Sequence, residues 1–415
     1  MLKFLPIIFA IILSLMNIQF RSDEQFHMAT SEFDDKVLNE KPVHTPNFNS
    51  VNVVRLTWQP VPYAVRYKVS YGNKSVITPT VGVEIPVNGA DEVFKITALD
   101  FDNQVAADDL PIVSTEINPK ATRTTSEFDK MAYPPLYVVY SWIPTKGADH
   151  YEIRLCKDGQ VIRTVETNFD LEEDHNFDFY DEDPVIEDGN YYWQVRGISA
   201  DNVAITDWSE VNPGNSFTVE KPARFCAIGD SITHGGAVTV TPAQVFCNWE
   251  TYCNAPVKNL GHSGDTTEQI LDRFDYDVLP FKPEILFVMA GVNDFRVGIL
   301  GSYSVKNLAE IKNLCDEHGI IPVFITPTPI NPERIFKTKF VEAPPTDWRY
   351  QRETICNWIR QQKYFIDITE EMTDDEGNLK AYLTTDGLHP DSEGKQIIGK
   401  AVENWILNYV NKNSQ

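Results

Sequence analysis

The hydrophobic pattern of this chain changes near Pro222, and the change limits the folds that each part can adopt. From about Val51 to Glu220, short runs alternate apolar and polar side chains between Pro, Gly and Asn, which is typical of antiparallel β-strands. After Pro222 the apolar runs are continuous and alternate with helical stretches. Runs that are apolar on both faces are typical of a parallel sheet covered by helices. We therefore expect an all-β first part and an α/β second part.

Length and charge narrow the class of protein further. A chain of 415 residues exceeds the size of one ordinary core, which favours two or three domains. The 60 acidic and 36 basic side chains give a formal net charge of -24. Such a surface repels phosphate backbones, so we expect no nucleic-acid partner, and neutral or cationic substrates are favoured over polyanions.

The first 21 residues have the order of charge and apolar residues that a secretory signal needs. Lys3 precedes an uncharged apolar run from Phe4 to Phe20, and Arg21 follows it. The run is short for a membrane span. Its end lacks a small-residue cleavage pattern, so residues 1–21 are a signal peptide or an uncleaved N-terminal anchor. We expect an exported protein that is periplasmic, extracellular or on the cell surface, without stable membrane insertion unless this segment is retained.

The β part contains an internal repeat. Five residues recur at identical spacing: Trp58, Pro60, Ala64, Tyr67 and Val69 return as Trp142, Pro144, Ala148, Tyr151 and Ile153. A match at this spacing indicates two copies of one small sandwich, at residues 45–120 and 127–220, each with a Trp and a Tyr in its core. The arrangement resembles the fibronectin type III module, in which an early-strand Trp and a following Tyr line the core. A carbohydrate-binding platform would instead need these aromatic side chains to be exposed.

Metal sites and disulfides are weakly indicated. The acidic run at residues 166–188 supplies oxygen ligands, but it lacks the D-x-[DN]-x-[DN]-G pattern of a calcium loop, so we expect a solvated loop. The six cysteines lack zinc-site spacing. Cys247 and Cys253 are close enough to pair, and the sequence leaves that question open. We expect no metal and no cofactor.

The second part, residues 223–415, reads as strand, loop and helix in repetition. Strands are expected at 224–228, 256–260, 284–290, 320–326 and 364–368, and helices at 242–252, 266–278, 305–318, 348–362 and 392–410. This pattern predicts an α/β/α three-layer domain with a five-stranded parallel sheet. Its reactive groups should lie beyond the carboxyl ends of the strands.

The loops at those ends carry the residues of a nucleophilic hydrolase. Ser231 follows the first strand at a turn into a helix, where its hydroxyl is exposed. A serine hydroxyl attacks only when a base takes its proton, and His389 is the available imidazole. Asp386, three residues earlier, is close enough to orient that ring. An acyl-transfer intermediate also needs oxyanion donors, which the Ser231 and Gly261 amides and the Asn293 side chain can supply; at Gly261 a side chain would crowd the oxyanion.

Four motifs in order, G-D-S-I-T, N-L-G-H-S-G, G-V-N-D and D-G-L-H-P, resemble the consensus blocks of the SGNH (GDSL-type) esterase and acylhydrolase superfamily. The resemblance covers about residues 223–412 and implies a serine esterase. It assigns the triad to Ser231, Asp386 and His389, and the oxyanion hole to Ser231, Gly261 and Asn293. Asp230 is expected to brace the turn.

Rival assignments of the same loops are weaker. The run Gly261-His262-Ser263-Gly264 begins like a G-x-S-x-G elbow, but Asp265 stands at the fifth position, so Ser263 is expected to shape the loop. His234 and His262 lack a carboxylate at triad spacing, although either could contact substrate. The nucleotide-binding patterns G-x-x-x-x-G-K-[ST] and G-x-G-x-x-G are absent.

The substrate is less sharply indicated. The Pro-rich loop at residues 327–347 follows the fourth strand and should border the site. Candidate substrate contacts are Asp230, His262, Arg334 and Phe336. Exported members of the family with appended β-sandwiches resemble polysaccharide deacetylases, so we expect an O-acetyl carbohydrate esterase acting on an acylated small molecule or an acetylated polysaccharide. A lipase or lysophospholipase for longer acyl chains and an inactive glycan-binding protein remain the alternatives.

Overall fold

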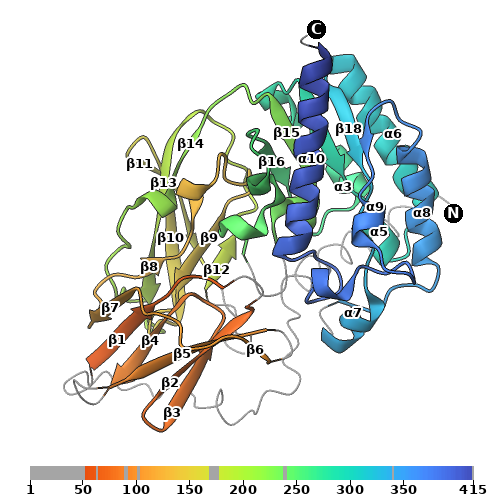
Figure 1. Cartoon of the computed structure of the whole chain (residues 1–415). Helices are drawn as coiled ribbons and strands as arrows, with labels where there is room; N and C mark the ends of the chain where they lie inside the picture. Colours follow the sequence, from red (N-terminus) through yellow and green to blue (C-terminus); the bar gives the residue numbers. More distant parts are fainter. Residues whose placement is uncertain are drawn as a thin grey trace, which may run out of the picture.

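The computed structural model describes residues 52–61, 64–87, 92–100, 103–167, 177–236, 241–338 and 341–413. The predicted signal or anchor at residues 1–21 lies outside the described residues. The described parts form two β units and an α/β unit, which follow one another in colour along the chain in Figure 1.

The first β unit, residues 52–117, consists of an antiparallel three-stranded sheet, β4-β1-β7, and an antiparallel four-stranded sheet, β3-β2-β5-β6. Its strands are β1 (Asn52–Thr57), β2 (Arg66–Tyr71), β3 (Lys74–Thr78), β4 (Gly82–Val87), β5 (Phe94–Leu99), β6 (Val105–Ala107) and β7 (Ser114–Ile117). Apolar side chains of both sheets share one core.

The second β unit, residues 123–219, has the same division into β12-β9-β8 and β11-β10-β13-β14, again with antiparallel pairing. Its strands are β8 (Arg123–Thr124), β9 (Val139–Ile143), β10 (His150–Lys157), β11 (Gln160–Glu166), β12 (Asp178–Tyr180), β13 (Gly189–Ile198) and β14 (Ser216–Val219), with 3₁₀ turns at Phe128–Lys130 and Pro213–Asn215.

The repeat seen in the sequence is a repeat in space. The rings of Trp58 and Tyr67 are 5.3 Å apart in the first unit, and those of Trp142 and Tyr151 are 4.9 Å apart in the second. Each tyrosine hydroxyl accepts a hydrogen bond from the backbone N–H three residues after the tryptophan. All four side chains are buried, which confirms that they belong to the cores. The resemblance to fibronectin type III modules and the domain boundaries stay predictions.

The α/β unit has the expected five-stranded parallel sheet, in the order β16-β15-β17-β18-β19. The strands are β15 (Phe225–Gly229), β16 (Lys258–Gly261), β17 (Ile285–Met289), β18 (Ile321–Ile325) and β19 (Phe365–Ile366). The helices are α2 (Ser231–His234), α3 (Thr267–Asp272), α4 (Phe274–Asp277), α5 (Val292–Arg296), α6 (Gly301–His318), α7 (Pro332–Thr338), α8 (Trp348–Ile359), α9 (Thr369–Met372) and α10 (Ser392–Asn413). Further 3₁₀ turns lie at Leu279–Phe281 and Ala381–Leu383. Because the strands are buried along both faces, they read as continuous apolar runs.

Three expected elements differ from the structure. The helix predicted at 242–252 is two 3₁₀ turns, Val245–Cys247 and Trp249–Tyr252, because the Asn248 and Thr251 side chains bind the backbone carbonyls of this segment. The helix predicted at 266–278 is divided at Arg273 into α3 and α4. The expected loop at 327–347 contains α7.

The second β unit packs directly on the α/β unit (Figure 1). Buried apolar side chains of both units form one continuous cluster. Leu136 N–H donates to the Asn259 carbonyl at 2.9 Å, and the buried Lys258 ammonium donates to the Pro134 carbonyl at 2.9 Å. Strand β16 therefore contacts the second β unit at Lys258 and Asn259.

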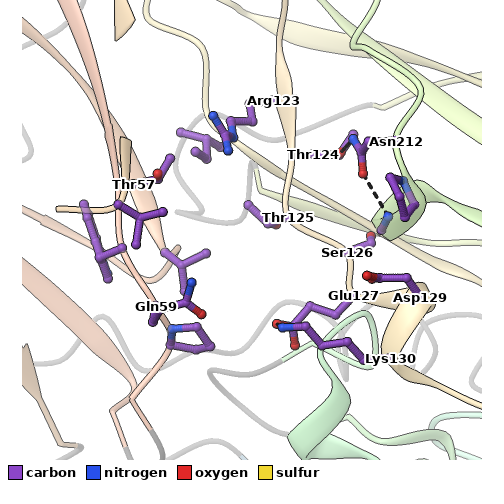
Figure 2. A pocket seen from close by; sticks show the side chains of 17 residues that line it. Thr57, Gln59, Arg123, Thr124, Thr125, Ser126, Glu127, Asp129, Lys130 and Asn212 are labelled. Atoms are coloured by element: carbon purple, nitrogen blue, oxygen red, sulfur yellow. Dashed lines mark hydrogen bonds and ion pairs between the residues drawn. The ribbon is translucent and has the colours of Figure 1, made fainter. Parts of the chain in front are cut away.

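A cavity of about 320 Å³ lies between the two β units, with Thr57 and Gln59 on one side and Arg123 and Asn212 on the other (Figure 2). Both free cysteines of the candidate pair, Cys247 and Cys253, are buried and unbridged. Among the described residues, none of the helices combines the length and apolar character that crossing a membrane requires.

Candidate active site

The loops at the carboxyl ends of the strands bring a serine, a histidine and an aspartate into one line. Ser231 Oγ lies 2.9 Å from His389 Nε2, and His389 Nδ1 lies 2.7 Å from Asp386 Oδ2. Because an ionised carboxylate only accepts hydrogen bonds, Nδ1 carries the proton and Nε2 can accept the one on Ser231. The three side chains are at least nine-tenths buried. This is the geometry of an activated nucleophile.

Asp386 is held in its ionised form. Burial alone would raise its pKa, but the charge of His389 and hydrogen bonds to the carboxylate outweigh burial and lower the pKa. The backbone N–H groups of Leu388 and His389 each donate to Oδ1 at 2.7 Å. The backbone of the loop therefore holds one carboxylate oxygen of Asp386, while the other oxygen binds the His389 ring.

Asp230 lies beneath the turn that carries Ser231, and its contact with substrate stays a prediction. Its side chain is 1% exposed, and Oδ1 accepts the Ile232 N–H at 3.0 Å, which caps the short helix α2 that Ser231 begins. Burial raises the pKa of Asp230 to about 7, and the nearby Lys395 ammonium opposes that shift. Lys395, from α10, donates to the Ile232 carbonyl at 2.5 Å and so supports the same turn.

The reason given for a glycine at position 261 is wrong. A Cβ there would lie 2.3 Å from His234 N and 2.7 Å from Thr233 C, so the glycine lets α2 pack on β16. The Gly261 N–H is already used, because it donates to Asn259 Oδ1 at 2.8 Å. This N–H is therefore not free to bind an oxyanion.

Two other backbone donors of these loops are free. The Ser231 and Gly264 N–H groups have no acceptor within the part of the chain that the structure describes. Asn293, at the start of α5, lies beside the Gly264 loop, since its Nδ2 donates to the Asp265 carbonyl at 3.0 Å. That nitrogen has a second hydrogen to donate.

A family model for the GDSL-like lipase/acylhydrolase family matches residues 227–397. This region is a GDSL-like acylhydrolase domain. The α/β unit, which contains the matched residues, is called the acylhydrolase domain below.

Individual relatives match more distantly. The uncharacterized lipoprotein YqeF of Bacillus subtilis (strain 168) is 37% identical over 116 residues, 25% of this chain and 48% of that protein. This chain thus spans about half the length of that relative. A GDSL-like lipase from Bacteroides thetaiotaomicron is 22% identical, with a TM-score of 0.39 over 46% of this chain and 93% of that one. An acetylxylan esterase from Geobacillus stearothermophilus is 18% identical, with a TM-score of 0.34 over 45% and 95%. At such values the two structures say nothing about the substrate.

The second β unit borders the acylhydrolase domain's catalytic loops. His262 Nδ1 is 2.8 Å from Asp265 Oδ1, so the expectation that this histidine lacks a carboxylate at triad spacing is wrong. Its Nε2 is 3.0 Å from Glu182 Oε2 of the β unit, so no ring nitrogen is left to act on a serine. Burial disfavours the charged ring, but the hydrogen bonds to the two carboxylates outweigh it and raise the pKa of His262 to about 9. His262 is therefore an imidazolium that ties the two units together.

His234 is a neutral counterpart to His262. Its Nε2 lies 2.7 Å from the Tyr137 carbonyl, which only accepts, so Nε2 carries the proton. Its Nδ1, 2.9 Å from Ser263 Oγ, must then accept the serine hydroxyl. Burial and the charge of His262 lower the pKa of His234 to about 3. The hydrogen bond to His234 thus fixes the orientation of the Ser263 hydroxyl within its loop.

The remaining predicted contacts lie on α7. This helix packs on the triad loop, because a Cβ at Gly387 would lie 2.6 Å from Ile335 N and 2.9 Å from Arg334 Cβ. Arg334 is half-buried there, whereas Phe336 is 78% exposed. The structure thus brings Arg334 to the triad loop and leaves Phe336 on the surface of the same helix.

The acidic run contributes more than a solvated loop, which corrects that prediction for its described part. Asp178–Tyr180 forms the edge strand β12, and Asp181 is buried between Tyr140 and Arg163. Sequence reasoning missed Tyr180 and Glu182 as neighbours of the site. The alternation of polar and aromatic residues in this strand was the available signal, but nothing local shows which unit the polar face meets. Residues 168–176 of the run lie outside the described residues.

Proposed function

We propose that this protein is a serine ester hydrolase, with Ser231 as nucleophile, His389 as general base and Asp386 as the group that orients the base. The observation that carries the proposal is the continuous line from Ser231 Oγ through the His389 ring to Asp386, with distances of 2.9 and 2.7 Å. The family match over residues 227–397 supports the same chemistry.

The reaction follows from these positions. As Ser231 Oγ attacks the ester carbonyl, its proton passes to His389 Nε2, and Asp386 stabilises the imidazolium. The alcohol leaves with the proton that His389 returns, and an acyl-enzyme remains. Water then repeats the sequence against the acyl group, which releases the acid and restores Ser231.

The oxyanion needs donors that are not already bonded. We assign this role to the N–H groups of Ser231 and Gly264 and to the Asn293 side chain. Both backbone donors lack acceptors among the described residues, and Asn293 already contacts the loop of Gly264 through the Asp265 carbonyl. Gly264 therefore replaces Gly261 in the proposed oxyanion hole.

For the substrate we propose an O-acetylated carbohydrate. The contact between the second β unit and the acylhydrolase domain is polar: Glu182 of the β unit pairs there with the His262 imidazolium of the acylhydrolase domain. A polar border of this kind suits an alcohol with several hydroxyl groups. The exposed Phe336, on the helix that packs on the triad loop, favours a second candidate, an ester with a longer acyl chain. The experiment below separates the two.

We also propose that the protein is exported. The order of charge and apolar residues at 1–21 supports export, as does the description of the Bacillus relative as a lipoprotein. Cell fractionation followed by N-terminal sequencing of the exported form tests the proposal. Recovery of full-length protein in the cytoplasm alone would contradict it.

The direct test of the activity is hydrolysis of 4-nitrophenyl esters by the wild type and by Ser231→Ala. We expect the wild type to cleave the acetate and the variant to lose that activity while its circular dichroism spectrum stays unchanged. A chain-length series from acetate to decanoate then distinguishes the substrates: kcat/KM that falls with length supports a deacetylase, and kcat/KM that rises supports the longer-chain candidate. Retained activity in Ser231→Ala would refute the catalytic assignment.

A further inference from the structure

Tyr180 extends from the second β unit toward the loop that carries the catalytic serine. It lies on β12, an edge strand whose neighbour is β9. Side chains alternate along a strand, and Phe179 stacks on Tyr140 inside the β unit, with ring centres 6.4 Å apart. Tyr180 therefore faces the opposite way, and the edge of its ring meets the His234 ring of the acylhydrolase domain at 5.7 Å.

Gly236 leaves a small space between Tyr180 and the nucleophile. A methyl carbon at Gly236 would lie 3.5 Å from Tyr180 Oη, 3.3 Å from Ser263 Oγ and 4.0 Å from Ser231 Cβ. These values are close to van der Waals contact on three sides. A group that enters this space touches the tyrosine hydroxyl and the loop of the catalytic serine at the same time.

The polar groups around the space are arranged to bind a hydroxyl group. Tyr180 Oη makes no hydrogen bond to a described residue, and burial raises the pKa of its phenol, so it stays a donor at neutral pH. Ser263 donates its hydrogen to the neutral His234 and keeps its lone pairs free to accept. One donor and one acceptor thus face the same space. An alcohol hydroxyl, which both donates and accepts, matches that pair.

We propose that Tyr180 and Ser263 form a subsite for the alcohol part of the ester, selecting substrates in which that alcohol carries further hydroxyl groups, as a sugar does. The inference rests on the proposed ester hydrolysis at Ser231 and adds a specificity determinant that the β unit supplies. The acyl group lies on the other side of the attacked carbonyl. The second β unit is in this view a part of the substrate site.

The experiment compares Tyr180→Phe with the wild type on two acetates. One is a mono-O-acetylated methyl xyloside, whose alcohol keeps free hydroxyls, and the other is 4-nitrophenyl acetate, whose alcohol has none. Loss of one hydrogen bond to substrate should lower kcat/KM for the xyloside about three- to tenfold and leave the nitrophenyl ester within about twofold. Tyr276→Phe, an exposed tyrosine on α4, is the matched control and should change neither.

A second variant, Gly236→Ala, fills the space without removing a polar group. Its contacts of 3.3 to 4.0 Å can be accommodated, so the fold should persist, and kcat/KM for the xyloside should again fall more than for the nitrophenyl ester. Equal losses on both acetates, or no loss on either, overturn the subsite, as does a wild type that cleaves only the nitrophenyl ester. A wild type that cleaves neither acetate overturns the subsite, and a wild type that also leaves every 4-nitrophenyl ester from acetate to decanoate intact overturns the proposed esterase itself.

Discussion

The imidazole of His262, in the acylhydrolase domain, lies 3.0 Å from the carboxylate of Glu182, in the second β unit. The other ring nitrogen of His262 binds Asp265, which also accepts a hydrogen bond from Arg273 at 2.6 Å. The loop that contains His262 and Asp265 is therefore linked to the β unit by consecutive ion pairs. Movement of the β unit relative to the acylhydrolase domain would disturb that loop.

Glu182→Gln should change how stability depends on pH. Because the pKa of folded His262 is raised to about 9, its contribution to stability is complete below about pH 6.5, the pKa expected in the unfolded chain, and is lost as pH rises through about 9. Removing the Glu182 charge lowers the folded pKa of His262, so the contribution at pH 6 should be smaller and its loss should be complete at a lower pH. Thermal unfolding midpoints between pH 6 and 10 measure this shift.

Asp183→Asn is the matched control for that experiment, because Asp183 is a neighbouring carboxylate that pairs with Arg163 and not with His262. Its pH profile should follow that of the wild type. If Glu182→Gln and Asp183→Asn give the same profile, Glu182 does not hold the charge on His262.

Asn293→Ala should impair turnover more than folding. In the proposed oxyanion hole this side chain is a donor beside the Gly264 loop, and loss of one such donor costs about tenfold to a thousandfold in kcat. We expect KM for 4-nitrophenyl acetate to change much less. Asn293→Asp, which keeps the size but places a carboxylate near the oxyanion, should be at least as inactive. Wild-type kcat in either variant would remove Asn293 from the oxyanion hole.

Gly261→Ala should act through packing. Its Cβ would press on the backbone of α2 at His234 N, and forced overpacking of this kind costs about 1–3 kcal/mol or more. Urea unfolding should therefore show a loss of stability, and activity should fall because Ser231 moves with α2. A variant with native stability and reduced kcat would instead support a direct catalytic role for Gly261.

Lys395→Met should destabilise the turn that carries the nucleophile. The buried ammonium donates to the Ile232 carbonyl and interacts electrostatically with the carboxylates of Asp230 and Glu250. Removing one charged partner from such a buried arrangement costs about 3–5 kcal/mol in stability. Urea unfolding measures the change in free energy. Lys400→Met, at an exposed position of the same helix α10, should be close to neutral. Unchanged or higher stability in Lys395→Met would show that the ammonium is dispensable.

Elements that depend on local periodicity could be predicted from the sequence alone. Alternation predicted the sandwiches, continuous apolar runs predicted the parallel sheet, and the repeat of Trp58 and Tyr67 predicted two similar cores. Ser231, Asp386 and His389 could be grouped before the structure, because the carboxyl ends of parallel strands meet at one edge of a sheet.

Which residues of the second β unit lie near Ser231, Asp386 and His389 could be learned only from the folded structure. Glu182 and His262 are 80 residues apart, and their contact exists because two separately folded units bury apolar faces against each other. The spacing of residues within a motif carries no information about such docking. Gly261 shows the same limit at close range. Its motif marks the position, but the packing reason for the glycine appears only in the folded chain, where a Cβ at this position would lie 2.3 Å from His234 N of α2.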